Sequence, residues 1–238
     1  MFQLRQLDLA MLWPGAPQTQ LDGHVQARPE AAGWRLEVDL RNSLTGAWDQ
    51  GRIPLQQLQG QLLHGASGWE LPTLLARWPG GGAQGAGRWQ TGDWQGNWQI
   101  ERLQPGQWLK SLQGPALSGQ VRAEHKASDG LHLAVQLHPD AVPAPPATAV
   151  ASTRQASHAR AGLDAQARWH QGRWSVPRLE LHWAGAHLQA EGQWQPEAQA
   201  LLARAQWQLP GLNGQLDGQL SPSQGRGQWL LAVQDAMR

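Results

Sequence analysis

Apolar and polar residues alternate along several stretches of this chain. In residues 33–40, GWRLEVDL, and again in residues 130–137, GLHLAVQL, every second residue is apolar. Leu179, Leu181 and Trp183 continue the same alternation, and so do Leu188, Ala190, Gly192 and Trp194. A period of two predicts β-strands that bury one face and expose the other to water. We therefore expect a mostly β, antiparallel fold.

Turns and helices can be predicted from shorter signals. Residues 89–94, WQTGDW, and 169–174, WHQGRW, place a glycine between two tryptophans, as a tight hairpin turn requires. Residues 105–112, PGQWLKSL, have proline at a suitable first helical position, and residues 197–207, EAQALLARAQW, are rich in good helix formers. These two segments predict at most short helices.

Three sequence patterns recur along the chain. The pattern W-x-[LV]-P-x-L-x-x-x-W begins at Trp69 and at Trp174, and L-x-G-x-[VL]-x-[AG] begins at Leu21, Leu117 and Leu212. The third pattern is the alternating octet of residues 33–40 and 130–137. Recurrence on one scale and in one order predicts a repeat architecture. We expect one elongated β-repeat region over residues 1–238, with units of about 21–116, 117–211 and an incomplete 212–238.

The ends of the array and one internal segment depart from the repeat. Repeat arrays need polar terminal caps, and neither end shows a clear one, so we expect the chain to be a fragment of a longer protein. The N-terminal residues contain no stretch of about 18 apolar residues, and we find no signal or transmembrane segment in the sequence. Residues 139–157 are rich in proline and alanine and predict a loop between strands.

The predicted inward face mixes large apolar side chains with very small ones. LDGHVQA from Leu21 and LSGQVRA from Leu117 place glycine and alanine beside leucine and valine. Either a second sheet packs closely over the glycines, or the sheet curves or folds over into an apolar groove with room for a flexible ligand. We predict that the groove offers apolar surface without catalysis or head-group specificity, through Leu21, Val25, Leu36, Val38, Leu40, Leu117, Val121, Leu131, Leu133, Val135, Leu137, Leu179 and Leu181.

The amino-acid composition limits the kinds of binding partner that we expect. Lys plus Arg is 19 and Asp plus Glu is 18, so the net charge of +1 supplies no basic field for nucleic acid. The chain has no cysteine, which excludes disulfides and thiolate metal sites. It has 15 tryptophans and no tyrosine. These tryptophans could pack at strand ends, form a platform for sugar rings, or sit where apolar surface meets water.

The sequence contains no strong motif for cofactor binding, metal binding or catalysis. Gly80, Gly82 and Gly85 satisfy G-x-G-x-x-G, but strand and turn patterns follow them instead of the helix that a dinucleotide needs. His182 and His187 are five residues apart, which places them on opposite faces if one strand runs through both. No recognisable hydrolase triad occurs. We therefore expect no cofactor, no metal site and no enzymatic activity.

The motifs PALSGQV, LPGLNGQLDGQL and W-x-[LV]-P-x-L-x-L-x-W-x-G resemble the periplasmic β-repeats of the TamB family, within the AsmA-like superfamily. The resemblance covers residues 20–238. It implies a long β-taco-like sheet with a hydrophobic groove that carries phospholipid across the periplasm and supports outer-membrane biogenesis and protein secretion by the translocation and assembly module. It also implies an inner-membrane anchor and an outer-membrane barrel partner elsewhere in the full-length protein. The alternative is a non-enzymatic, tryptophan-rich β scaffold that binds glycans or serves adhesion.

Overall fold

The computed structural model describes residues 1–31, 33–140, 161–183, 185–221 and 224–233. Most of the predicted loop at 139–157 lies outside these residues, and its first residue, Pro139, ends a strand. The chain is mostly antiparallel β with very few helices, as predicted. It divides into two compact units, Met1–Ala127 and Ser128–Arg238, which are described separately.

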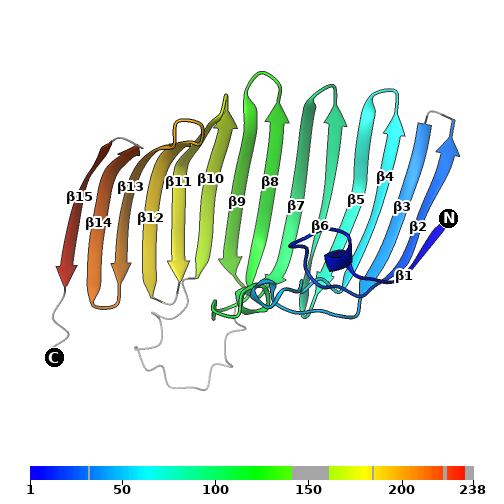
Figure 1. Ribbon diagram of the computed structural model, residues 1–238, viewed down its shortest axis with the longest axis horizontal. Coiled ribbons are helices and arrows are strands. Elements are labelled where there is room, and N and C mark those ends of the chain that lie inside the picture. The colour runs from blue at the N-terminus through cyan, green and yellow to red at the C-terminus, as the bar shows by residue number, and fades with distance from the viewer. Residues whose placement is uncertain (32, 141–160, 184, 222–223, 234–238) are drawn as a thin grey trace, which may run out of the picture. The chain divides into compact units, whose positions relative to one another are not determined.

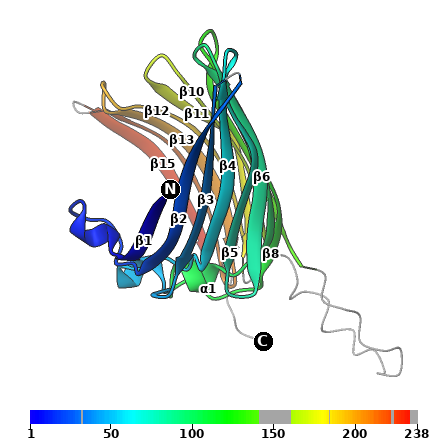
Figure 2. The ribbon, with the colours of Figure 1, turned by 90° about the vertical axis from the view of Figure 1, so that its right-hand side faces the viewer.

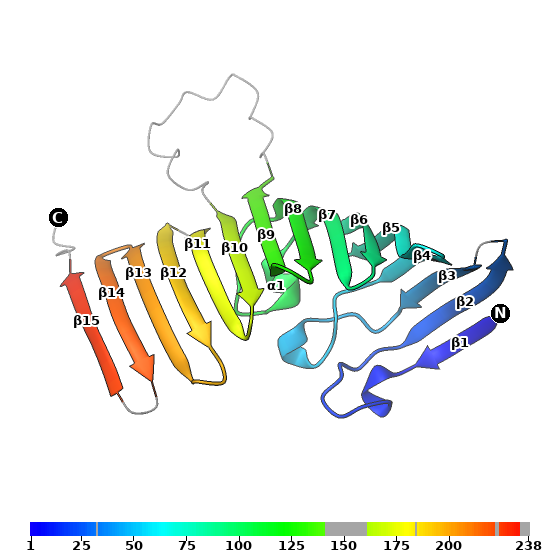
Figure 3. The same cartoon turned by 90° about the horizontal axis from the view of Figure 1, so that it is seen from above.

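The first unit is a curved antiparallel meander. Each strand pairs with the next strand along the chain, and Figure 3 shows that they follow an arc. Its strands are β1 (Phe2–Leu7), β2 (Leu21–Glu30), β3 (Gly33–Asn42), β4 (Gln57–Gly65), β5 (Gly68–Trp78), β6 (Gly81–Gln90), β7 (Asp93–Leu103) and β8 (Leu117–Lys126).

The second unit is also an antiparallel meander in chain order (Figure 1). Its strands are β9 (Gly130–Pro139), β10 (Gly162–His170), β11 (Arg173–Trp183), β12 (Ala186–Gln195), β13 (Ala200–Leu209), β14 (Leu212–Ser221) and β15 (Gln224–Val233).

The strands follow the repeat units expected from the sequence. Strands β2 to β7 fall within residues 21–116, and β8 to β13 fall within 117–211. Strand β14 starts at Leu212, where the third copy of the L-x-G pattern begins. Each full copy therefore supplies six strands, and equivalent strands carry equivalent motifs.

The predicted hairpins form. Trp89 pairs with Trp94 across a two-residue turn in which Thr91 and Gly92 have φ of 42° and 89°. The equivalent turn at Gln171 and Gly172 has φ of 49° and 74°. Positive φ at both central residues is the geometry that matches the right-handed twist of the flanking strands, and glycine reaches it without a steric penalty.

Of the two helix predictions, one is confirmed and one is wrong. Helix α1 (Pro105–Trp108) forms at the predicted proline, but residues 200–209 are strand β13 instead of a helix. The alanines and leucines of this segment favour a helix in isolation. Their positions also fit a period of two, and the ladder hydrogen bonds to β12 and β14 override the intrinsic preference.

Three longer connections of the first unit form a cap, which we define as residues 8–20, 43–56 and 104–116. They carry the short helices η1 (Leu9–Met11), η2 (Trp48–Gln50) and α1, which Figure 2 shows at one end of the strands. The backbone N–H of Lys110 donates to Asp49 Oδ2 at 2.8 Å and joins two of these connections. Trp108 of the cap contacts Trp78 of β5 edge to face, with ring centroids 5.9 Å apart.

Candidate functional site

One face of the first unit is apolar across all its strands. The register pairs Val25 with Val38, and Trp98 of β7 with Val121 of β8, so that side chains of one face line up from strand to strand. No Asp, Glu, Lys or Arg occupies this face from β2 to β8. It carries all the groove residues predicted in this unit: Leu21, Val25, Leu36, Val38, Leu40, Leu117 and Val121.

The second unit has an apolar face of the same kind. Leu137 of β9 pairs with Leu163 of β10, which in turn pairs with Leu181 of β11. The row continues into β12, where Leu181 faces Leu188. This face carries the remaining predicted groove residues: Leu131, Leu133, Val135, Leu137, Leu179 and Leu181.

The opposite face of each unit is polar. Arg204 on β13 contacts Glu191 on β12 at 3.1 Å and Asp217 on β14 at 3.0 Å. The hydrogen bond and charge of Asp217, with the charge of Glu191, raise the pKa of Arg204 above its ordinary value. In the first unit, Gln59 Nε2 donates to Asp39 Oδ2 at 3.0 Å. Each unit is therefore an amphipathic sheet whose two sides differ in charge.

Tryptophan rings, rather than a second sheet, cover several glycines of the apolar faces. A Cβ added at Gly85 or at Gly96 would meet the ring of Trp98, and one added at Gly214 would meet the ring of Trp207. Within the described residues, each unit is a single sheet. The tryptophan rings therefore fill the space beside Gly85, Gly96 and Gly214 that a second sheet would otherwise have to cover.

The apolar faces are only partly buried. Leu21, Leu117 and Leu137 are buried, while the ten other predicted groove residues are half-buried. At one end of the first unit's apolar face Leu21, Trp78 and Leu117 are 8%, 5% and 4% exposed, and farther along the strands Ala123 is buried at 7%. Trp78 contacts Trp108 of the cap, so the cap covers this end of the face, and most of the remaining face residues are half-buried or exposed.

An aromatic row lies at the other end of the first unit's apolar face. Successive cross-strand pairs place side chains in line from β3 to β8. Trp34, Trp69 and Trp89 within it are 54%, 43% and 41% exposed. Amphipathic aromatic rings suit a boundary between apolar surface and water. The row consists of Trp34, His64, Trp69, Trp89, Trp94 and His125.

The formal G-x-G-x-x-G spacing does not form a phosphate loop. Gly82 and Gly85 lie inside strand β6, which runs from Gly81 to Gln90 and turns into β7. A dinucleotide loop needs a helix N-terminus whose amides meet the pyrophosphate. The glycines here make room for neighbouring side chains and backbone.

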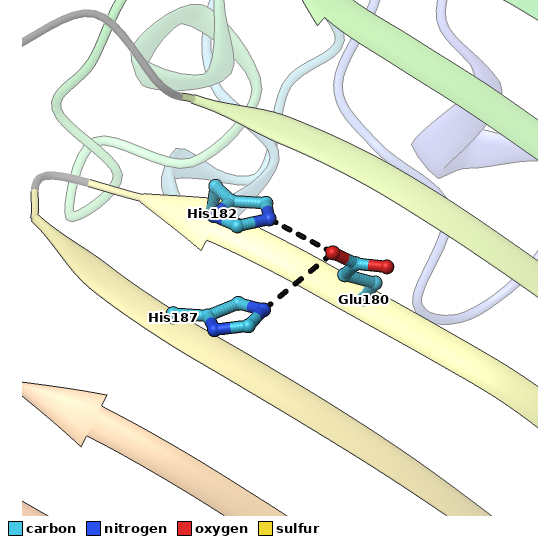
Figure 4. Close-up of side chains that lie close together, drawn as sticks. All are labelled: Glu180, His182 and His187. Carbon is cyan, nitrogen blue, oxygen red and sulfur yellow. Dashed lines mark hydrogen bonds and ion pairs between the residues drawn. The ribbon is translucent and has the colours of Figure 1, made fainter.

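The expectation that His182 and His187 lie on opposite faces is wrong. The chain turns between them, so His182 on β11 and His187 on β12 are direct cross-strand partners. Their rings stack with centroids 4.2 Å apart and planes 8° from parallel. Both face Glu180 (Figure 4). The glycine at position 185, with φ of +83°, was the sequence signal for this turn.

Comparison with family models, curated proteins and solved structures finds no match to this chain. No helix among the described residues is long and apolar enough to cross a membrane. The function therefore has to be inferred from the two sheet faces themselves.

Proposed function

We propose that the apolar faces bind phospholipid acyl chains, and that this chain is a segment of a periplasmic lipid conduit that serves envelope biogenesis. The observation that carries the proposal is the row-by-row continuity of apolar side chains, without a charged group, from β2 to β8 and again from β9 to β14. Soluble monomers rarely leave apolar faces of this extent uncovered, and such faces mark interaction sites.

Acyl chains fit this surface better than a rigid ligand does. Apart from the aromatic row at one end, the face offers no row of hydrogen-bonding groups that would orient a polar molecule. Its surface is uneven, because the ring of Trp98 stands beside glycines. A flexible hydrocarbon adapts to such a surface, and its transfer from water is favourable by about 0.8 kcal/mol for each buried CH₂ group. Strands of ten residues rise by about 33 Å, which accommodates a whole acyl chain.

The wider role rests on the resemblance to TamB. Under this proposal, phospholipid passes along the apolar faces, while an inner-membrane anchor and an outer-membrane barrel partner belong to the full-length protein. The protein is then periplasmic and non-enzymatic. The uncharged face supports this role, because a conduit must hold its cargo without strong, specific contacts that would stop it.

A second candidate function is glycan binding by the aromatic row. Its support is the exposure of Trp34, Trp69 and Trp89, whose rings stand at one end of the strands. Sugar rings stack on exposed indoles of this kind. The two functions use different residues and can be separated by substitution.

A photoreactive residue at selected positions tests the lipid proposal. With a benzophenone side chain at Val121 or Val135, on the apolar faces, we expect cross-links to radiolabelled phospholipid in the bacterial envelope. Gln120 and Gln136 are matched controls, because each precedes or follows the test residue in the same strand but points to the polar face. Equal labelling on the two faces, or none on the apolar face, would refute the proposal.

Glycan binding is tested by replacing Trp69 or Trp89 with alanine. The glycan function predicts binding on a glycan array that each substitution abolishes, while lipid cross-linking at Val121 persists. A wild-type protein that binds no glycan on the array removes this second candidate.

A further inference from the structure

Three side chains converge on the polar face of the second unit. His182 Nε2 lies 3.1 Å from Glu180 Oε1, and His187 Nε2 lies 3.6 Å from the same oxygen (Figure 4). The three donor atoms all lie within 4.8 Å of one another. Residues i and i+2 of a strand share a face, and directly opposed residues are nearest neighbours across it. The register of β11 and β12 therefore builds the cluster.

The carboxylate of Glu180 is held in place by a second contact. Arg178 donates to Glu180 Oε2 at 2.8 Å and leaves Oε1 directed at the two imidazoles. The hydrogen bond from His182, followed by that from Arg178, lowers the pKa of Glu180 below its ordinary value. Outer contacts of this kind orient the ligands of metal sites and raise their affinity.

One donor of the cluster has no hydrogen-bond partner. His187 Nε2 is buried from solvent and makes no hydrogen bond, because 3.6 Å to Glu180 is too long for one. A buried ring nitrogen without a partner is costly, and an ion between the three groups would satisfy it.

The surroundings allow a cation to enter. Glu180 borders an open hollow of about 400 Å³ that is also lined by Arg178 and Gln189. Asp164, directly opposite Glu180 on β10, adds a second carboxylate within 3.9 Å of Arg178. Glu191 and Arg204 also line the hollow, so the carboxylates of Asp164, Glu180 and Glu191 outnumber the guanidinium groups of Arg178 and Arg204 in this neighbourhood.

We propose that Glu180, His182 and His187 form a binding site for a divalent first-row transition metal, with Zn²⁺ the ion that best matches two imidazoles and one carboxylate. Zn²⁺ binds such groups at about 2.0–2.2 Å, so slight closure of the three side chains completes the site. Three protein ligands leave one coordination position for water. The site ties β11 to β12 beside their turn and is independent of the apolar faces, since Leu179 and Leu181 point to the other side.

Zinc binding to the full chain, purified without a histidine tag, tests the site. Competition with a chromophoric zinc chelator at pH 7.5 should give one tight site in the wild type. We expect His182→Gln and His187→Gln each to weaken it at least tenfold, and Glu180→Gln to weaken it as well. X-ray absorption of the zinc complex should show imidazole scattering.

His132→Gln is the matched control, because His132 also contacts a carboxylate on this unit, Asp129 at 2.8 Å, but has no second histidine beside it. Its zinc affinity should equal that of the wild type. Zinc should raise the melting temperature of the wild type and of His132→Gln, since a ligand of the native state stabilises it, and should not raise that of His187→Gln. Equal zinc affinity in the wild type and in a His182→Gln/His187→Gln double variant would overturn the proposal, and so would the absence of binding.

Discussion

Trp98 of β7 lies over Gly85, its direct partner on β6, so closely that a β-carbon at Gly85 would overlap its ring. Gly85→Ala must therefore displace Trp98 and strain β6. We expect it to destabilise the first unit by about 1–3 kcal/mol, the usual cost of overpacking. Chemical denaturation followed by circular dichroism measures this loss.

Gly218 is the control for this substitution. It also lies mid-strand on an apolar face, but the atoms nearest to an added Cβ are 3.5–3.6 Å away, at ordinary contact distance. Gly218→Ala should be neutral or stabilise by up to about 1 kcal/mol, because it restricts the unfolded chain. If the two variants lose equal stability, the glycines do not serve to accommodate tryptophan rings.

Asn42 is the hydrogen-bonding centre of the capped end. Buried at 6% exposure, its Oδ1 accepts from the N–H of Gln20 at 3.0 Å and of Leu44 at 3.2 Å. Its Nδ2 donates to the carbonyl of Leu55 at 3.1 Å.

Asn42→Ala removes the partner of these backbone groups, which lie on half-buried residues. Each unpaired group costs about 1–3 kcal/mol, so the substitution should destabilise the first unit by at least about 2 kcal/mol. Hydrogen exchange should speed up at residues 43–56 of the cap before it does so in the strands. Uniform exchange across the unit would show that Asn42 does not hold the cap.

Asp39 makes the stability of the first unit depend on pH. Hydrogen bonds from Gln59 and then Gln57 lower its pKa below the ordinary value of 3.8. In the acid range the unfolded chain therefore binds more protons at this residue than the native state does. The stabilisation is complete above the ordinary pKa and is lost as pH falls through the lower, native pKa.

Comparison with Asp39→Asn isolates this effect. The wild type should be more stable than the variant at pH 6, and the gap should close below about pH 4. Thermal melts across this range measure the gap. A gap that is constant from pH 6 to pH 3 would mean that Asp39 titrates alike in the folded and unfolded chain.

The sequence predicts which face of the sheet each residue occupies, but not the register between neighbouring strands. Alternation in residues 33–40 and 130–137 identifies the apolar face because side-chain direction in a strand depends only on period two. The tryptophan–glycine hairpins could also be predicted, because their signal lies within a few neighbouring residues. Which residue lies opposite Gly85 depends on the register with β7, so the filling of the glycines by Trp98 could not be deduced from β6 alone.

Two predictions failed for reasons of the same kind. Residues 200–209 form a strand because neighbouring ladders on both sides outweigh helix preference. His182 and His187 share a face because the turn at Gly185 lies between them, and the assumption of one continuous strand hid that turn. Treating the glycine as a hairpin signal, as for residues 89–94 and 169–174, would have revealed the pair.

The central claim, that the apolar faces bind phospholipid, is tested most directly by native mass spectrometry of the chain purified gently from a bacterial envelope. We expect bound phospholipid in the wild type, loss of that lipid in Val121→Asp and Val135→Asp, and retention in Gln120→Asp and Gln136→Asp, which place the same charge on the polar faces. A wild-type protein that is folded and free of lipid, or lipid retained in both valine variants, would contradict the account.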